Sequence, residues 1–321
     1  MASNARLLLA EVKQMIPPLS DKLHKGQAGR VGIVGGSRNY TGAPYFASMS
    51  CMRFGADMSY TICDPEAGNA LKAYSPDLIV NPLLGESRAL PAVRKDLEAL
   101  FERLHSIVVG PGLGRDCHMQ KCCRIALELA RQKDVWTVID ADGLYLVAND
   151  PSVVQGWSKV VLTPNVVEFG RLCNAMKVDT EKNPNEAAKL LSQALNGPVI
   201  LQKGKDDRIT NGKEVLTCSA PGSLKRAGGQ GDILAGTLSC LLAWAKIFHY
   251  GDAVHAGAPS PDTILEDRLL LLAAYGAAET ARRCSHEAFK KHGRALLADD
   301  LLSEVGNAYK HLFGEPVKEA L

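Results

Sequence analysis

The 321-residue sequence has little net charge and no long hydrophobic run. Its 37 basic and 35 acidic residues leave a formal charge of +2, which is too weak to attract nucleic acid or an anionic membrane surface. No run of about 18 apolar residues occurs, so we expect no membrane-spanning helix. The apolar stretch 7–10 is too short for a secretory signal. We therefore expect a cytoplasmic protein, with an organellar isoform left open, that binds neither nucleic acid nor membranes.

Several common catalytic motifs are absent as well. The nine cysteines include no C-x-x-C pair, so zinc and redox motifs lack support, and free thiols in a reducing compartment are the simpler interpretation. The eight histidines show no metal-ligand spacing. The glycine loops match neither the Walker A pattern nor a dinucleotide-binding fingerprint, and no G-x-S-x-G occurs. These absences disfavour P-loop NTPases, Rossmann dehydrogenases and serine hydrolases.

What the sequence does contain is a regular alternation of short apolar segments and longer helical ones. This alternation indicates an α/β fold with a mainly parallel central sheet and helices on both faces. No linker or internal repeat interrupts it, so we expect one domain over residues 1–321. The expected strands cover residues 30–36, 58–63, 78–80, 106–109, 135–139, 159–162 and 199–202, and then 208–210 and 214–218 in a hairpin. The expected helices cover residues 3–15, 41–56, 92–104, 118–131, 187–195, 263–290 and 296–312, and residues 251–261 are expected to form a surface loop.

Four of the expected strands end in residues suited to binding or catalysis. These ends are the glycine-rich segment 110–114, Asp140 with Asp142, the segment 163–165, and Lys203-Gly204. In open parallel sheets, ligands bind beyond the carboxyl ends of the strands. We therefore expect these four segments to meet at one edge of the sheet.

Residues 222–236 form the most informative stretch of the chain. Gly228, Gly229 and Gly231 crowd into four positions just before an apolar helical run that extends through Ala245. Glycine lets backbone N–H groups approach a ligand, and a helix N-terminus offers unpaired donors to an anion such as phosphate. Asp232 would repel a phosphate, so it is better suited to take a proton from the group that attacks the phosphate. The alternative is an ordinary helix cap.

Two pairs of polar residues near the strand ends allow two interpretations each. Asp140 or Asp142 could orient Mg²⁺ through water, or cap the helix that follows Gly143. Asn165 and Glu168 stand three residues apart at a helix start. They could bind substrate hydroxyls or metal-bound waters, or form a capping box.

The basic residues near the glycine loop also leave two possibilities open. Lys203 could neutralise phosphate charge, although a single lysine after a strand is usually solvated. Lys225 and Arg226 lie inside the glycine loop, where they could hold a γ-phosphate or remain solvated surface charges.

Together, three segments resemble the ribokinase-like superfamily. They are Thr-Pro-Asn-Val-Val-Glu-Phe at 163–169, Lys-Gly at 203–204, and Gly-Gly-Gln-Gly-Asp-Ile-Leu-Ala-Gly at 228–236. Within that superfamily the sequence is most similar to the ATP-dependent (S)-NAD(P)H-hydrate dehydratases, and the segments 35–37, 41–44, 75–77 and 110–116 fit that family too. The similarity spans about residues 19–312. One departure is Asn81, where we expect a histidine in many relatives.

The resemblance implies a repair reaction. A hydrated, damaged NADH or NADPH (NADHX or NADPHX) would be phosphorylated by ATP with Mg²⁺ and then lose phosphate to restore the ring. Asp232 would be the catalytic base, and Glu168 is a candidate metal residue. The hydrate would contact Gly114, Asn165, Val166, Val167, Glu168, Phe169, Gly170, Arg171 and Asp232. ATP would lie along Lys203, Gly204, Lys205, Asp206, Asp207, Gly222, Ser223, Leu224, Lys225, Arg226, Ala227, Gly228, Gly229, Gln230 and Gly231.

The same resemblance bears on partners and alternatives. Bacterial relatives often carry a fused epimerase, and this chain is too short for one, so an epimerase on a separate chain is the expected functional partner; a homo-oligomer is possible. Two other functions remain open. A small-molecule kinase of the same fold, acting on a vitamin-precursor alcohol, would release a stable phosphate ester. A non-catalytic nucleotide-binding protein is disfavoured by the complete glycine loop and by Asp232.

Overall fold

The computed structural model describes residues 2–21, 23–251 and 264–314, and within them nine strands form one sheet. The sheet order is β3-β2-β1-β4-β5-β6-β7-β8-β9. Strands β1 to β7 pair in parallel, whereas β7–β8 and β8–β9 pair antiparallel. The strands are β1 Arg30–Val34, β2 Met58–Ile62, β3 Ile79–Asn81, β4 Ser106–Val109, β5 Trp136–Ile139, β6 Val160–Leu162, β7 Val199–Gln202, β8 Asp207–Thr210 and β9 Val215–Cys218.

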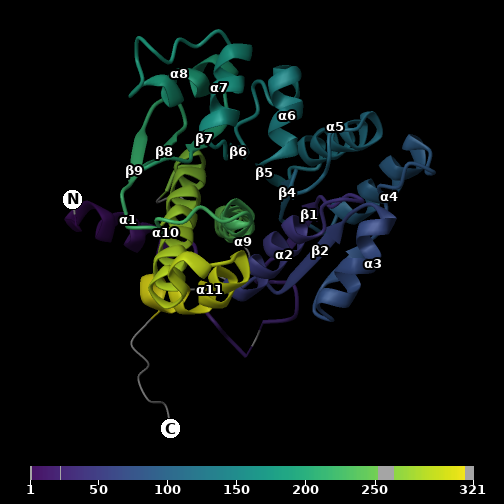
Figure 1. Ribbon diagram of the computed structural model, residues 1–321, viewed down its shortest axis with the longest axis horizontal. Coiled ribbons are helices and arrows are strands. Elements are labelled where there is room, and N and C mark those ends of the chain that lie inside the picture. The colour runs from purple at the N-terminus through teal and green to yellow at the C-terminus, as the bar shows by residue number, and fades with distance from the viewer. Residues whose placement is uncertain (1, 22, 252–263, 315–321) are drawn as a thin grey trace.

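Helices cover both faces of this sheet (Figure 1). They are α1 Ala2–Gln14, α2 Gly42–Phe54, α3 Pro65–Tyr74, α4 Leu90–Phe101, α5 Cys117–Gln132, α6 Asp142–Asn149, α7 Val166–Ala175, α8 Ala187–Leu195, α9 Gln230–His249, α10 Glu266–His292 and α11 Ala298–Phe313. The mainly parallel, two-faced α/β fold expected from the sequence is confirmed. The expected loop 251–261 lies outside the described residues, apart from Gly251.

Buried side chains form two large clusters, one on each face of the sheet. In β4, for example, Val108 belongs to the cluster shared with α1, α2, α9, α10 and α11, while Ile107 and Val109 belong to the cluster shared with α4 to α8. Successive side chains of a strand point to opposite faces. A central strand covered on both sides must therefore be apolar at every position, which explains the continuous apolar runs in the sequence.

One helix was missed from the sequence. No helix was expected between residues 63 and 78, but Pro65 is the first residue of α3. The Asp64 carboxylate accepts a hydrogen bond from the backbone N–H of Glu66, and proline tolerates the first helical position because no intrahelical partner exists there for its missing N–H. The pair therefore both ends β2 and starts a helix.

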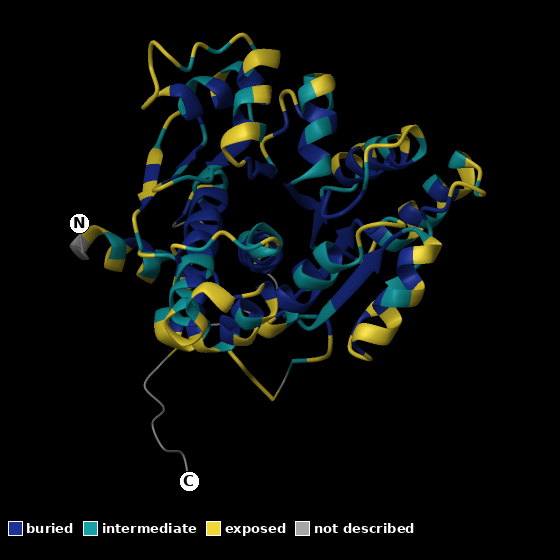
Figure 2. Cartoon of the chain, in the orientation of Figure 1, coloured by how far each residue is buried: buried dark blue, intermediate teal, exposed yellow. Residues whose placement is uncertain are grey.

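Helix α9 is the most deeply buried long helix among the described residues. Of its 20 residues, 15 are buried. Figure 1 shows it at the centre of the molecule between α10 and α2, and most of it is dark blue in Figure 2. It is the one described helix long and apolar enough to cross a membrane by length and composition, with 83% of that window buried inside the fold. Its apolar character is accounted for by this internal packing.

The axis of α9 approaches α2 closely at Gly236. A Cβ placed on Gly236 would lie 2.1 Å from the backbone oxygen of Ala47 and 2.2 Å from Ser50 Oγ. Neither the Ala47 backbone nor the buried Ser50 can move away easily in a packed interior. Glycine is therefore required at this crossing, and the crossing holds the N-terminal half of α9 against the sheet.

We predict that Gly236→Ala destabilises the protein by about 1–3 kcal/mol or more, because overpacking outweighs the better helix propensity of alanine. Gly306 is the matched control: it lies inside α11, and a Cβ there would meet no atom within 4 Å. Gly306→Ala should stabilise by up to about 1 kcal/mol. Thermal unfolding midpoints of the two variants should shift in opposite directions, and a stabilised Gly236→Ala variant would contradict the crossing described here.

Candidate active site

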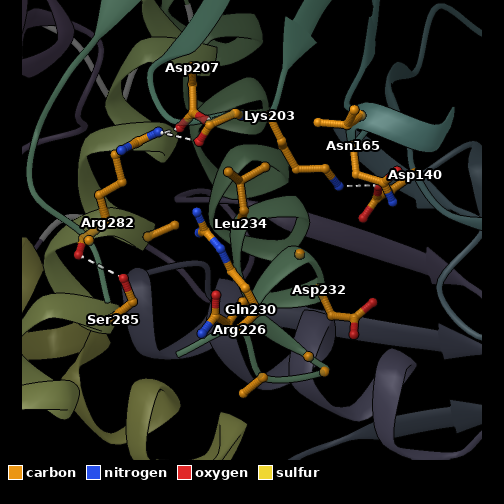
Figure 3. Close-up of a pocket in the computed structure, with 18 of the residues that line it drawn as sticks. Asp140, Asn165, Lys203, Asp207, Arg226, Gln230, Asp232, Leu234, Arg282 and Ser285 are labelled. Carbon is orange, nitrogen blue, oxygen red and sulfur yellow. Dashed lines mark hydrogen bonds and ion pairs between the residues drawn. The ribbon is translucent and has the colours of Figure 1, made fainter. Parts of the chain in front are cut away.

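A cavity of about 610 Å³ opens where the carboxyl ends of β5, β6 and β7 meet the start of α9 and one face of α10 (Figure 3). Its size is typical of a small-molecule site, about 300–1,000 Å³. Strands β4, β5, β6 and β7 are consecutive neighbours in the sheet. The four strand ends singled out in the sequence therefore lie side by side, as expected, and three of them contribute residues to the cavity wall.

The glycine loop shapes the wall next to α9. Gly229 is the N-cap of α9, has a φ of 94° and makes no side-chain cap bond. A Cβ on Gly229 would lie 2.5 Å from Ala298 Cβ, whereas Gly228 has open space around it. No side chain caps the first turn of α9, and a helix N-terminus of this kind offers unpaired backbone N–H groups to phosphate.

Asp232 lies inside the first turn of α9, two residues after its first residue, Gln230. The alternative that Asp232 caps the helix is wrong, because the cap position belongs to Gly229. The pKa of Asp232 is raised from its ordinary value of 3.8 to about 7, chiefly by burial and also by the neighbouring Asp140 and Glu168 carboxylates, while Lys203 opposes the shift. A carboxylate with a pKa near neutrality is well placed to take up a proton at physiological pH.

Lys203 and Asp140 form an ion pair at the floor of this cavity. Lys203 Nζ lies 2.8 Å from Asp140 Oδ1, and the two side chains are 20% and 3% exposed. Burial alone would lower the pKa of Lys203, but Asp140 and Glu168 raise it, so the ammonium keeps its charge. The solvated interpretation of Lys203 is wrong. A Cβ on Gly231 would lie 3.4 Å from Lys203 Nζ, which places this cation at the phosphate-binding end of α9.

The structure confirms a capping box at the start of α7. Asn165 Oδ1 accepts hydrogen bonds from the backbone N–H groups of Val167 and Glu168, and Glu168 Oε2 accepts one from the Asn165 N–H. Both side chains also line the cavity. Burial raises the pKa of Glu168; Lys203 lowers it and Asp140 raises it further. The capping bonds therefore fix Asn165 and Glu168 at the cavity wall, where both side chains can still contact a ligand.

Asp142 was expected either to orient Mg²⁺ or to cap the helix that follows Gly143, but its side chain contacts other groups. Its Oδ2 accepts the backbone N–H of Gly114 at 2.9 Å, and its Oδ1 pairs with Arg115 Nε at 2.8 Å. It makes no cap bond at the start of α6. Asp142 therefore holds the glycine-rich turn after β4.

Among the described residues, no group of three or more His, Cys, Asp or Glu side chains is arranged to hold a metal ion by itself.

Lys225 and Arg226 do not act as the pair expected from the sequence. Lys225 Nζ donates to the backbone oxygen of Leu296 at 2.7 Å and does not line the cavity, whereas Arg226 does. Lys225 therefore anchors the glycine loop to the segment before α11. Of the two cations, Arg226 alone is placed to meet a ligand in this structure.

The comparisons with known proteins agree with this geometry. Residues 31–307 match the family model described as NAD(P)H-hydrate dehydratase. The chain belongs to this family. It is 57% identical to the ATP-dependent (S)-NAD(P)H-hydrate dehydratase of Mycosarcoma maydis, over 98% of this chain and 91% of the relative. The human protein of the same description is 46% identical, over 94% of this chain and 83% of the relative.

Solved structures of low sequence identity share the fold of this dehydratase family member. A hypothetical protein from Streptococcus mutans superposes with a TM-score of 0.74 at 20% identity, covering 96% of this chain and 98% of its own. The ADP/ATP-dependent NAD(P)H-hydrate dehydratase of Bacillus subtilis, co-crystallised with ATP/Mg²⁺, gives 0.68 at 19% identity, covering 95% and 97%. A putative ribokinase from E. coli gives 0.51 at 12% identity, consistent with the ribokinase-like architecture.

The cavity gathers most, but not all, of the residues expected to bind ligands. The expected residues that line it are Asn165, Val166, Glu168, Lys203, Gly204, Lys205, Asp207, Gly222, Arg226, Ala227, Gly228, Gly229, Gln230, Gly231 and Asp232. The expected residues outside its wall are Gly114, Val167, Phe169, Gly170, Arg171, Asp206, Ser223, Leu224 and Lys225. Phe169 is only 5% exposed and belongs to the core. Leu224 is 88% exposed and points to solvent.

Several lining residues were not among the expected ligand contacts. Asp140 was noted as a possible metal or helix-capping residue, and Ala141 and Leu234 are neighbours of residues already named. The remaining three are Ala281, Arg282 and Ser285 on α10. Nothing in the local sequence of α10 distinguishes these positions from an ordinary helix face, so the tertiary structure alone reveals them.

The raised pKa of Asp232 predicts a pH-dependent effect on stability. The folded protein holds the Asp232 proton between about pH 4 and pH 7, where the unfolded chain has released it. Stability therefore falls as pH rises through this window and the full penalty persists above it. Asp232→Asn removes the titration, so its melting temperature should exceed that of the wild type by more at pH 8 than at pH 5. An equal difference at both pH values in a fluorescence melting assay would contradict the assignment.

Proposed function

We propose that this chain catalyses the ATP-dependent dehydration of the (S) hydrates of NADH and NADPH, with release of ADP and phosphate. The observation that carries the proposal is the placement of Asp232 and Lys203 beside the uncapped N-terminus of α9. A base, a cation and a phosphate-binding helix end then meet in one cavity. The relatives named as ATP-dependent (S)-NAD(P)H-hydrate dehydratases support the choice of substrate.

In this mechanism the ring hydroxyl of the hydrate is the nucleophile. Asp232 removes its proton as the oxygen attacks the γ-phosphorus of ATP, and ADP leaves. The first-turn N–H groups of α9 and the Lys203 ammonium stabilise the charge that builds up on the transferred phosphoryl oxygens. The C–O bond then breaks with phosphate, a far better leaving group than hydroxide. Loss of a proton from the adjacent ring carbon restores the double bond.

Mg²⁺ fits the charge distribution of the site. Burial and the nearby Asp140 carboxylate raise the pKa values of Glu168 and Asp232, so this end of the cavity favours a cation. Since the described residues form no complete metal site, we propose that Mg²⁺ arrives on ATP and that Glu168 holds it through water. There it would neutralise phosphate charge during transfer.

Two wider features complete the proposal. Because the named relatives act on the (S) form, an enzyme on a separate chain that interconverts the two hydrate epimers would let this reaction consume both.

We further propose that the protein acts in the cytoplasm, consistent with nine cysteines that all remain free thiols. In a reducing compartment such thiols persist.

The reaction can be tested directly. Purified protein with ATP, Mg²⁺ and chemically prepared NADH hydrate should regenerate the absorbance of reduced nicotinamide, and removal of Mg²⁺ with a chelator should abolish the recovery. A folded protein that binds ATP but recovers no NADH would refute the proposed reaction. Accumulation of a stable phosphate ester instead of NADH would indicate the alternative, a small-molecule kinase of the same fold.

Asp232→Asn tests the role of the base. Asparagine keeps the shape of the side chain but cannot accept the proton, so turnover should fall by about 10²–10⁴-fold while ATP binding persists. In the wild type, kcat/KM should rise with pH through about 7, because Asp232 is active only when deprotonated. This rise of kcat/KM with pH should be missing from the residual activity of the variant. Near-normal turnover in Asp232→Asn would refute the role of Asp232 as the base.

A further inference from the structure

The guanidinium of Arg282, on α10, connects three separate segments of the cavity wall. Its Nε donates to Asp207 Oδ2 at 2.7 Å, its Nη1 to the backbone oxygen of Ala220 at 3.0 Å, and its Nη2 to the backbone oxygen of Gly204 at 3.1 Å. Ala220 precedes the glycine loop, and Gly204 lies in the turn between β7 and β8. One side chain thus joins the two backbone segments expected to lie along ATP.

The Arg282–Asp207 ion pair is well shielded from solvent. The two side chains are 14% and 7% exposed. Asp207 Oδ1 also accepts the backbone N–H of Gly204 at 2.9 Å, so both carboxylate oxygens are occupied within the protein. Asp207 was expected to bind ATP and lines the cavity; its side-chain contacts hold the Gly204 turn and Arg282 in place. Charge-assisted bonds in a fixed fork geometry give strong orientation.

A second residue of α10 extends this connection. Ser285 lies one turn after Arg282; its Oγ accepts the backbone N–H of Ser223 at 3.2 Å and donates to the Arg282 backbone oxygen at 3.0 Å. A Cβ on Gly222 would lie 3.3 Å from the same Oγ. The start of the glycine loop therefore rests directly on α10. Arg282 and Ser285 both line the cavity.

These contacts lie on the opposite side of the cavity from the proposed chemistry. Figure 3 shows Asp207, Arg282 and Ser285 grouped together, facing Asp140 and Asp232 across the opening. The hydrate was expected to contact the side that carries Asn165 and Asp232. A change at Arg282 should therefore affect the nucleotide far more than the hydrate.

We propose that Arg282 is a positioning residue that sets the separation and orientation of the Gly204 turn and the glycine loop, and so controls the affinity for ATP. This inference rests on the proposed function. The Gly204 turn belongs to the sheet edge and the glycine loop follows Ala220 toward the start of α9. Arg282 hydrogen-bonds to the backbone of both segments, at Gly204 and at Ala220.

Arg282→Lys is the informative variant. Lysine keeps the charge and can keep the ion pair with Asp207, but as a point charge it cannot also reach both carbonyl oxygens in the guanidinium geometry. The dissociation constant for a non-hydrolysable ATP analogue, measured by calorimetry, should rise roughly tenfold, which corresponds to ~1.4 kcal/mol. The KM for ATP should rise in parallel, while kcat and the KM for NADH hydrate change less than about twofold.

Arg283 is a matched control on the same helix. Its guanidinium pairs with Glu287 at 3.2 Å and does not line the cavity, so Arg283→Lys should leave analogue affinity unchanged. Ser285→Ala should weaken analogue binding by about threefold, as expected for one neutral hydrogen bond, and it tests the proposal even if Arg282→Lys does not fold. Unchanged affinity in every Arg282 and Ser285 variant that folds, or an equal rise in both KM values, would overturn it.

The calorimetric measurement separates this proposal from the proposed reaction. If the wild type binds the ATP analogue but recovers no NADH, the reaction is refuted and the role of Arg282 is still decided by analogue affinity. If the wild type recovers NADH and Arg282→Lys binds the analogue as tightly as the wild type, the reaction stands and the positioning role is refuted.

Discussion

The burial of α9 against the sheet is the constraint on which the rest of the structure depends. Its close crossing with α2 at Gly236 allows no side chain there, and its apolar surface packs on the central strands and α10. The helix therefore enters the core in one position, with its uncapped N-terminus next to the carboxyl ends of β5, β6 and β7. A phosphate-binding helix end is thereby brought to the sheet edge where ligands of such folds bind.

The charges at that edge favour chemistry at the expense of stability. Three carboxylates, those of Asp140, Glu168 and Asp232, share essentially one buried cation, Lys203. Burial, reinforced by the like charges, raises the pKa of Asp232 toward neutrality. This costs folding free energy progressively as the pH rises from about 4 to 7 but supplies a base that can accept a proton. The ion pair of Lys203 with Asp140 at 2.8 Å keeps the cation charged where phosphate is expected.

The parts of the fold and site that were predictable are those encoded by local sequence. The apolar strands, the glycine loop and the polar residues that directly follow β5 to β7 carry their own signals, because strand burial, backbone freedom and helix starts depend on neighbouring residues. The sequence did not reveal contacts whose partner is distant. Lys225, expected to bind ATP, donates to Leu296, and Lys203, also expected to bind ATP, pairs with Asp140 across 63 positions.

The sequence by itself therefore determined the α/β architecture, the family and the position of the phosphate-binding loop with its aspartate. Only the tertiary structure decided which charges surround Asp232 and which residues hold the loop. Arg282 illustrates the difference: it meets Gly204, Asp207 and Ala220 from 62 to 78 positions away in the chain. The physical reason is that hydrogen bonds and charge interactions depend on distance in space, and the folding of α10 onto the sheet edge creates those distances.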